Sequence, residues 1–214
     1  MNFLSLVLPV TCAACGVRGV DACRRCQSAF GPPFPVPTVG KGPPVYALAD
    51  YHGAARQLVL AFKERGRHTL ADFFAVLVGL ALPALSPPPW CLVPAPSTRR
   101  AARGRGGDHM VRIAERVQNS FSAPVLAVES GVQDSVGLDT QARIRNLQDK
   151  VKLRRPPPAA DVVLLDDVVT SGATARACVS ALSQADVRVR AVLALTSAAT
   201  RHVSIGPRRG RPQG

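Results

Sequence analysis

The residues with the most specific spacing are four cysteines near the N-terminus. They form two Cys-x-x-Cys pairs within fifteen residues, Cys12, Cys15, Cys23 and Cys26. Four thiolates in this spacing can converge on one ion and fill a tetrahedral zinc site with no open position for chemistry. In a reducing compartment they are not expected to form two disulfides. The cysteines therefore predict a structural zinc ion, with an iron–sulfur cluster or a redox pair as the alternatives.

A second group of chemically useful residues lies in the C-terminal third. The apolar run 162–165 is followed by two adjacent carboxylates, Asp166 and Asp167. After two more apolar residues comes a turn of small residues that opens a helix, with the sequence Thr170, Ser171, Gly172, Ala173 and Thr174. Unpaired N–H groups at a helix N-terminus favour a phosphate, and paired carboxylates suit the vicinal hydroxyls of a sugar or Mg²⁺. The alternative is a solvated strand end before an ordinary helix capped by Thr170 or Ser171.

The segments that must position these residues alternate between strand-like and helix-like patterns. We expect strands at 45–51, 90–93, 125–128, 162–165 and 189–196, and helices near 58–66, 70–82, 108–117 and 172–185. This alternation predicts an α/β fold with a parallel sheet flanked by helices. Ligands of such sheets bind beyond the carboxyl ends of the strands, which places the candidate site at Asp166 and the residues after it.

Proline content divides the chain. Residues 32–44 are rich in proline and predict an extended linker between a zinc-finger-like segment at 1–31 and a larger domain at 45–197. Residues 198–214, rich in Arg, Gly and Pro, predict a basic disordered tail. Two remaining cysteines, Cys91 and Cys178, lie in apolar contexts and are expected to be packed thiols.

Composition and charge narrow the class of protein. With 214 residues and 47% hydrophobic content, the chain is neither disordered nor fibrous. Its net charge of +13 favours anionic partners, such as phosphates, nucleic acid or acidic membrane surfaces. Prolines interrupt the uncharged stretch 73–98, so no membrane span is predicted. No Lys or Arg precedes the apolar N-terminal run, so we expect a cytoplasmic protein and not a secreted one.

The thirteen-residue string 162–174 resembles the ribose-phosphate signature of type I phosphoribosyltransferases at every position. This resemblance implies that Asp166 and Asp167 contact the ribose hydroxyls of phosphoribosyl pyrophosphate. It also implies that the loop 170–174 holds the 5-phosphate and that Mg²⁺ accompanies the pyrophosphate. In this class catalysis consists mostly of positioning and electrostatic stabilisation, so a catalytic His or Cys is not required. The four histidines share no metal spacing, and none is predicted to be catalytic: His52, His68, His109 and His202.

Further segments resemble the ComF family of phosphoribosyltransferase-domain proteins. They are the four-cysteine finger, residues 51–56 and 62–67, the strand exit 93–96 with its Arg-rich loop, and residues 133–147. Arg99, Arg100, Arg103 and Arg105 are candidates to grip the pyrophosphate, and Arg143 and Asn146 are candidate residues of a lid. The alternatives are a solvated basic loop and an ordinary capped helix beginning at Asp139. Many members have Gly-Phe-Asn-Gln where this chain has Gly-Gly-Asp-His at 106–109.

Two functions follow from these observations. The first is a phosphoribosyltransferase-type protein that binds phosphoribosyl pyrophosphate or a related ribose 5-phosphate ligand and transfers the phosphoribosyl group to an acceptor. The second, implied by the association of the ComF family with competence, is a non-enzymatic module that binds single-stranded DNA or a DNA-uptake helicase. Aromatic residues are scarce (Phe 7, Tyr 2, Trp 1), which disfavours the stacking platforms of single-strand binders.

Overall fold

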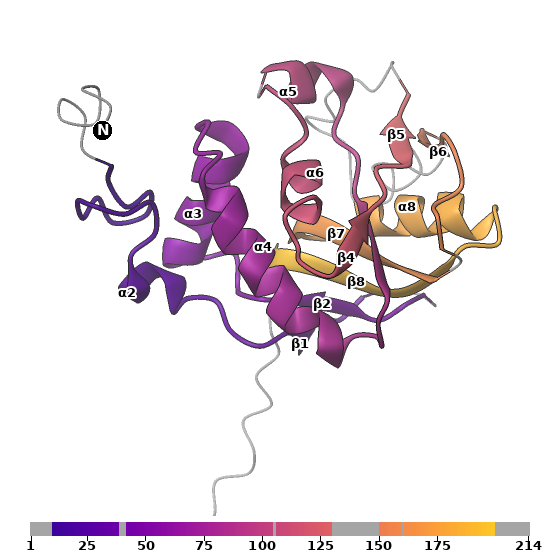
Figure 1. Cartoon of the computed structure of the whole chain (residues 1–214), viewed down its shortest axis with the longest axis horizontal. Helices are drawn as coiled ribbons and strands as arrows, with labels where there is room; N and C mark the ends of the chain where they lie inside the picture. Colours follow the sequence, from indigo (N-terminus) through magenta and orange to yellow (C-terminus); the bar gives the residue numbers. More distant parts are fainter. Residues whose placement is uncertain (1–9, 39–41, 105, 130–149, 160, 200–214) are drawn as a thin grey trace, which may run out of the picture.

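The computed structural model describes residues 10–38, 42–104, 106–129, 150–159 and 161–199, and its centre is a six-stranded sheet (Figure 1). In sheet order the strands are β1 (Phe34–Pro35), β2 (Val45–Ala47), β8 (Arg188–Ser197), β7 (Asp161–Val169), β3 (Trp90–Pro94) and β4 (Ser120–Ser122). Every neighbouring pair from β2 to β4 is parallel, and β1 alone is antiparallel to its neighbour. The predicted α/β fold with a parallel sheet is therefore confirmed.

The helices cover both faces of this sheet. They are α2 (Arg24–Gln27), α3 (Gly53–Glu64), α4 (Leu70–Ala81), the 3₁₀ helix η1 (Leu82–Ala84), α5 (Arg99–Gly104), α6 (His109–Ala114) and α8 (Ala173–Ser183). Buried residues of α3, α4 and α6 share one core with Val163 and Leu165 of β7. Buried residues of α8 share a second core with Val162 and Leu164 of the same strand. Side chains alternate along a strand, so residues 162–165 of β7 contribute to the two cores in turn.

One predicted strand lies elsewhere than expected, and one observed strand was not predicted. The predicted strand at 125–128 is β5 (Leu126–Val128), which pairs antiparallel with β6 (Val151–Leu153) outside the main sheet. The place beside β3 is taken by β4, a Ser-Phe-Ser segment that has no apolar run to reveal it. β4 is extended because it pairs with β3, and not because its own residues favour a strand.

The cysteine-rich segment packs on the sheet domain. Figure 1 shows this segment, with α2, at one end of the molecule beside α3. The ring of Phe30 meets Phe73 and Phe74 of α4 edge-on, with centroids 5.6 and 5.7 Å apart. Arg67 adds an ion pair to Asp21 at 3.5 Å and a hydrogen bond to the carbonyl oxygen of Thr11.

The proline-rich stretch also joins the fold. Phe34 and Pro35 pair with β2, and Val36 is buried. Proline is tolerated there because β1 is an edge strand, which needs no N–H on its open side. The segment predicted to be a linker therefore adds an edge strand to the sheet. None of the described helices is long and apolar enough to cross a membrane.

Candidate functional site

Asp166 and Asp167 lie at the carboxyl end of β7, where the alternation of the strand separates them. Asp167 faces α3 and α6, because it contacts Lys63 of α3 and His109 of α6. Asp166 faces α8, where burial, together with the charge of Asp166, raises the pKa of Cys178. Both carboxyl groups are buried. The two carboxyl groups therefore lie on opposite faces of the sheet.

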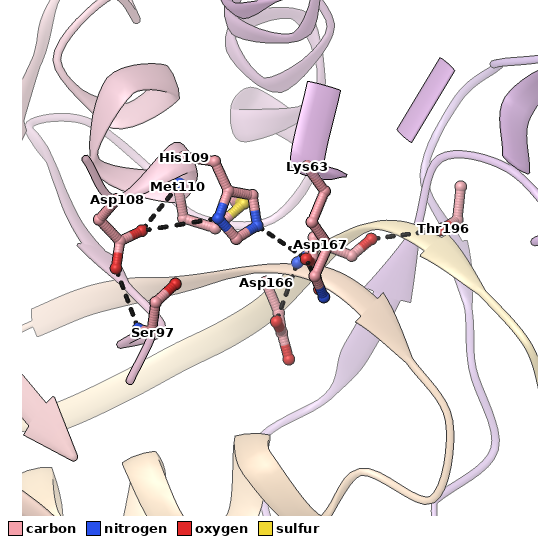
Figure 2. A network of polar contacts seen from close by, with 8 residues as sticks. All are labelled: Lys63, Ser97, Asp108, His109, Met110, Asp166, Asp167 and Thr196. Atoms are coloured by element: carbon pink, nitrogen blue, oxygen red, sulfur yellow. Dashed lines mark hydrogen bonds and ion pairs between the residues drawn. The ribbon is translucent and has the colours of Figure 1, made fainter. Parts of the chain in front are cut away.

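One oxygen of Asp167 has two strong partners. Its Oδ2 lies 2.7 Å from Nζ of Lys63 and 2.7 Å from Nε2 of His109 (Figure 2). The hydroxyl of Thr196 donates to the main-chain oxygen of Asp167 at 3.2 Å. Since an ionised carboxylate only accepts hydrogen bonds, Nε2 of His109 carries the proton in this contact. The side chain of Asp167 is therefore held in one orientation from the α3 and α6 side.

These contacts give the two carboxyl groups opposite protonation behaviour. Burial raises the pKa of Asp167, but the hydrogen bond from His109 and the charge of Lys63 outweigh burial and bring the pKa well below its usual value. Burial, together with repulsion from Asp167, raises the pKa of Asp166 to about 8. Oδ1 of Asp166 also accepts a hydrogen bond from the backbone N–H of Asp167 at 2.9 Å. Near neutral pH the pair therefore holds about one proton, with the negative charge on Asp167.

Asp108 connects this network to the loop that follows β3. Its Oδ1 accepts from the backbone N–H of Met110 at 3.0 Å and so caps α6. Its Oδ2 accepts from the backbone N–H of Ser97 at 2.9 Å (Figure 2). β3 and β7 are parallel neighbours, so the loop after β3 and the loop after β7 lie at the same edge of the sheet.

The loop after β7 turns through Gly172, which caps α8. Gly172 has φ of +71°, a conformation that favours glycine, so the N-cap is neither Thr170 nor Ser171. α8 begins at Ala173 and has eleven residues. The guanidinium of Arg176 lies beside this turn, since a Cβ on Gly172 would be 3.3 Å from its Nη1. That nitrogen is buried and has no hydrogen-bond partner among the described residues.

The residues predicted to grip a pyrophosphate are placed only in part. Arg99 and Arg100 open α5, directly after the loop that Asp108 contacts. They therefore lie at the same edge of the sheet as the acidic pair. The predicted lid residues, Arg143 and Asn146, lie outside the described residues.

The four cysteines meet in one cluster. Their sulfur atoms all lie within 4.8 Å of one another, and those of Cys15 and Cys23 are 3.6 Å apart. Zinc–sulfur bonds of about 2.3 Å in a tetrahedron place the sulfurs about 3.8 Å apart, so the cluster fits such an ion. Burial opposes the thiolate of Cys12, but backbone N–H groups, including that of Cys23, lower its pKa to about 6. Four cysteines close together could thus hold a metal such as zinc.

Three residues of the site were not predicted from the sequence: Lys63, His109 and Arg176. Lys63 had a usable signal, because it follows the buried Val59 by four residues and so lies on the buried face of α3. His109 was given no role, since its partner Asp167 is 58 residues away in the sequence. Arg176 lies just beyond the motif that singled out residues 162–174.

Comparison with known proteins gives few matches. No family model matches the chain, and no curated protein matches it. Two solved structures with similar folds are crystal forms, tetragonal and orthorhombic, of a hypoxanthine phosphoribosyltransferase from Staphylococcus aureus. The first is 15% identical with a TM-score of 0.38, covering 61% of this chain and 64% of that one. The second is 16% identical with a TM-score of 0.34, covering 60% and 62%.

The chain thus spans less than two thirds of the length of these structures. Similarity at these identities and TM-scores says nothing about substrate or activity. The class of fold rests on the strand order, the parallel pairing and the helices on both faces described above.

Proposed function

We propose that this protein is of the phosphoribosyltransferase type and binds phosphoribosyl pyrophosphate or a related ribose 5-phosphate ligand. The observation that carries the proposal is the placement of an acidic pair at the carboxyl end of β7, directly before the turn that opens α8. A sugar phosphate needs both features, hydrogen-bond acceptors for its hydroxyls and a cluster of donors for its phosphate. A four-cysteine segment precedes this domain. On that arrangement we propose that the chain belongs to the ComF family and that the cysteines hold a structural zinc ion.

In this proposal each part of the site binds one part of the ligand. The N–H groups and hydroxyls of residues 170–174 bind the 5-phosphate, and Asp166 and Asp167 accept hydrogen bonds from the ribose hydroxyls. Arg99 and Arg100, with Mg²⁺, bind the pyrophosphate. Transfer to an acceptor would proceed through an oxocarbenium-like transition state stabilised by the charge of the acidic pair.

Isothermal titration with phosphoribosyl pyrophosphate tests this function. We expect binding at one site per chain in the presence of Mg²⁺ and much weaker binding when a chelator removes the Mg²⁺. Ribose 5-phosphate alone should bind more weakly than the full ligand because it lacks the pyrophosphate contacts. The absence of both heat and thermal stabilisation at millimolar ligand would contradict the proposal.

The nucleic-acid alternative makes a different prediction. Binding of single-stranded DNA through phosphate contacts must weaken steeply as salt increases. If DNA binds with a flat salt dependence, a phosphate-contact mechanism is excluded. If DNA binds tightly and phosphoribosyl pyrophosphate does not, the alternative replaces our proposal.

Arg176 Nη1 lies beside the turn at Gly172 and is proposed to donate to the 5-phosphate. Replacing Arg176 by glutamine should therefore weaken binding of ribose 5-phosphate about ten- to a hundredfold, because a charge-assisted hydrogen bond to phosphate contributes about 1.5–3 kcal/mol. Titration of the variant measures the effect. Arg188→Gln is the matched control, since it removes the same charge from an exposed residue at the amino end of β8. Equal effects of the two substitutions would show that Arg176 acts only through net charge.

A further inference from the structure

A continuous series of polar contacts links the acidic pair to the loop after β3 (Figure 2). It runs from Lys63 to Asp167 and from Asp167 to His109, each at 2.7 Å. It continues through the next residue along the backbone, Asp108, whose Oδ2 accepts from the N–H of Ser97 at 2.9 Å. The series therefore runs from α3 across β7 and α6 to the loop after β3, which leads to the proposed pyrophosphate contacts.

The centre of this series is tightly packed. His109 is only 5% exposed, and its ring packs edge-on against Phe62 with centroids 5.9 Å apart. Its Nδ1 lies 3.9 Å from Oδ1 of Asp108, and that same oxygen caps α6 through Met110. The ring packing and the cap thus tie both side chains to the start of α6.

Asp108 and His109 point to different halves of the site. His109 contacts β7 beside the residues proposed to bind the ribose, whereas Asp108 contacts the backbone at Ser97, which leads into α5 at Arg99. A displacement of Asp167 therefore moves α6 and, through Asp108, the start of the loop that carries the proposed pyrophosphate contacts.

We propose that His109 and Asp108 are positioning residues that couple the ribose-phosphate half of the site to the pyrophosphate half. This inference rests on the proposed function, because it assumes that the two halves bind the two parts of one ligand. A ligand part that binds at Asp167 shifts α6 and, through Asp108, the backbone at Ser97, so the second part meets a loop that is already placed for it. Coupling of this kind is reciprocal and typically amounts to a factor of about 5–150 in affinity.

The coupling is measured with the two halves of the ligand as separate probes. Mg²⁺-pyrophosphate is titrated into the protein with and without saturating ribose 5-phosphate, and the ratio of the two affinities is the readout. We expect ribose 5-phosphate to strengthen pyrophosphate binding at least fivefold in the unmodified protein. A residue with a merely structural role changes stability and both affinities but leaves this ratio unaltered.

Three substitutions and one control make the test specific. His109→Phe retains the ring packing but cannot donate to Asp167, so the ratio should fall to about one. His109→Gln keeps a side-chain N–H donor and should restore most of the ratio. Asp108→Asn still caps α6 but presents an NH₂ group where Ser97 needs an acceptor, so it should also lose the coupling. Asp72→Asn is the matched control, since this carboxylate pairs with Arg116 on the surface.

Each outcome either supports or overturns the coupling. Binding of both probes with a ratio near one in the unmodified protein overturns the coupling and leaves the proposed function standing. A ratio that persists in His109→Phe also overturns it. Failure of both probes to bind overturns the proposed function and the coupling with it. A ratio that is lost in His109→Phe and Asp108→Asn and restored in His109→Gln supports the inference.

Discussion

Replacing Asp166 and Asp167 together by asparagine should reduce binding of phosphoribosyl pyrophosphate about a hundredfold. The carboxylate of Asp167 is proposed to accept a hydrogen bond from one ribose hydroxyl, which contributes about 1.5–3 kcal/mol, and the neutral carboxyl of Asp166 is proposed to accept another, which contributes about 0.5–1.5 kcal/mol. Loss of the negative charge also weakens stabilisation of a positively charged transition state. Isothermal titration measures the affinity, and retention of near-normal binding by the double variant would contradict the assignment.

The single variants should differ in stability. Asp167→Asn removes the anionic partner of Lys63 and His109, which we expect to cost about 2–4 kcal/mol in the free energy of unfolding, less than for a fully buried pair because Lys63 is partly exposed. Asp166→Asn should raise stability at pH 7, because the pKa of Asp166 is raised to about 8, so the unmodified chain must take up a proton on folding that the amide does not need. Urea unfolding measures both. Asp161→Asn, which breaks an exposed pair with Arg190, is the control.

The dependence of stability on pH follows from the directions in which the pKa values of Asp166 and Asp167 are shifted. Between about pH 4 and 8 the folded chain keeps a proton on Asp166 that the unfolded chain has lost, so this group lowers stability as pH rises. Asp167 acts oppositely, because its lowered pKa stabilises the fold above about pH 4 and that contribution is lost at lower pH. The difference in unfolding free energy between the unmodified protein and Asp166→Asn should therefore change steadily from pH 4 to 8. A constant difference over this range would contradict the raised pKa.

The strand, turn and helix that carry the proposed site could be predicted because their signals are local. The apolar run 162–165, the small-residue turn and the helix after it follow one another in the sequence, and the structure has them as β7, the turn at Gly172 and α8. The apolar stripe of α4 was equally visible, with Leu70, Phe74 and Val78 at helical spacing and buried.

What could not be predicted depends on contacts between distant segments. β4 contains Ser120, Phe121 and Ser122, and its position at the sheet edge comes only from pairing with β3. The contact of His109 with Asp167 joins two elements whose approach is set by core packing, which spacing along the chain does not reveal. The edge strand in the proline-rich stretch was also missed. Its sequence is typical of a linker, and it forms a strand only because it pairs with β2.

Removal of the metal should have the second largest effect. We expect the protein, purified under reducing conditions, to contain one zinc ion per chain by elemental analysis. Cys23→Ser should lose that ion and unfold the cysteine-rich segment, because a structural zinc ion contributes about 10–16 kcal/mol of apparent binding free energy to segments of this kind. A reduced preparation free of zinc would contradict the assignment of the cluster.

The packing at Phe30 determines how far that unfolding spreads. Cys12 and Cys26 belong to the same buried core as Phe30 and Phe74, so loss of the metal should also lower the stability of the layer formed by α3 and α4. Phe30→Ala separates the two effects, since it should retain zinc and yet destabilise the protein by about 3 kcal/mol by removing the ring from α4. If Cys23→Ser unfolds the segment without shifting the melting of the sheet domain, the contact at Phe30 does not couple them. If it shifts that melting as much as Phe30→Ala does or more, the metal stabilises the proposed binding domain through this aromatic contact.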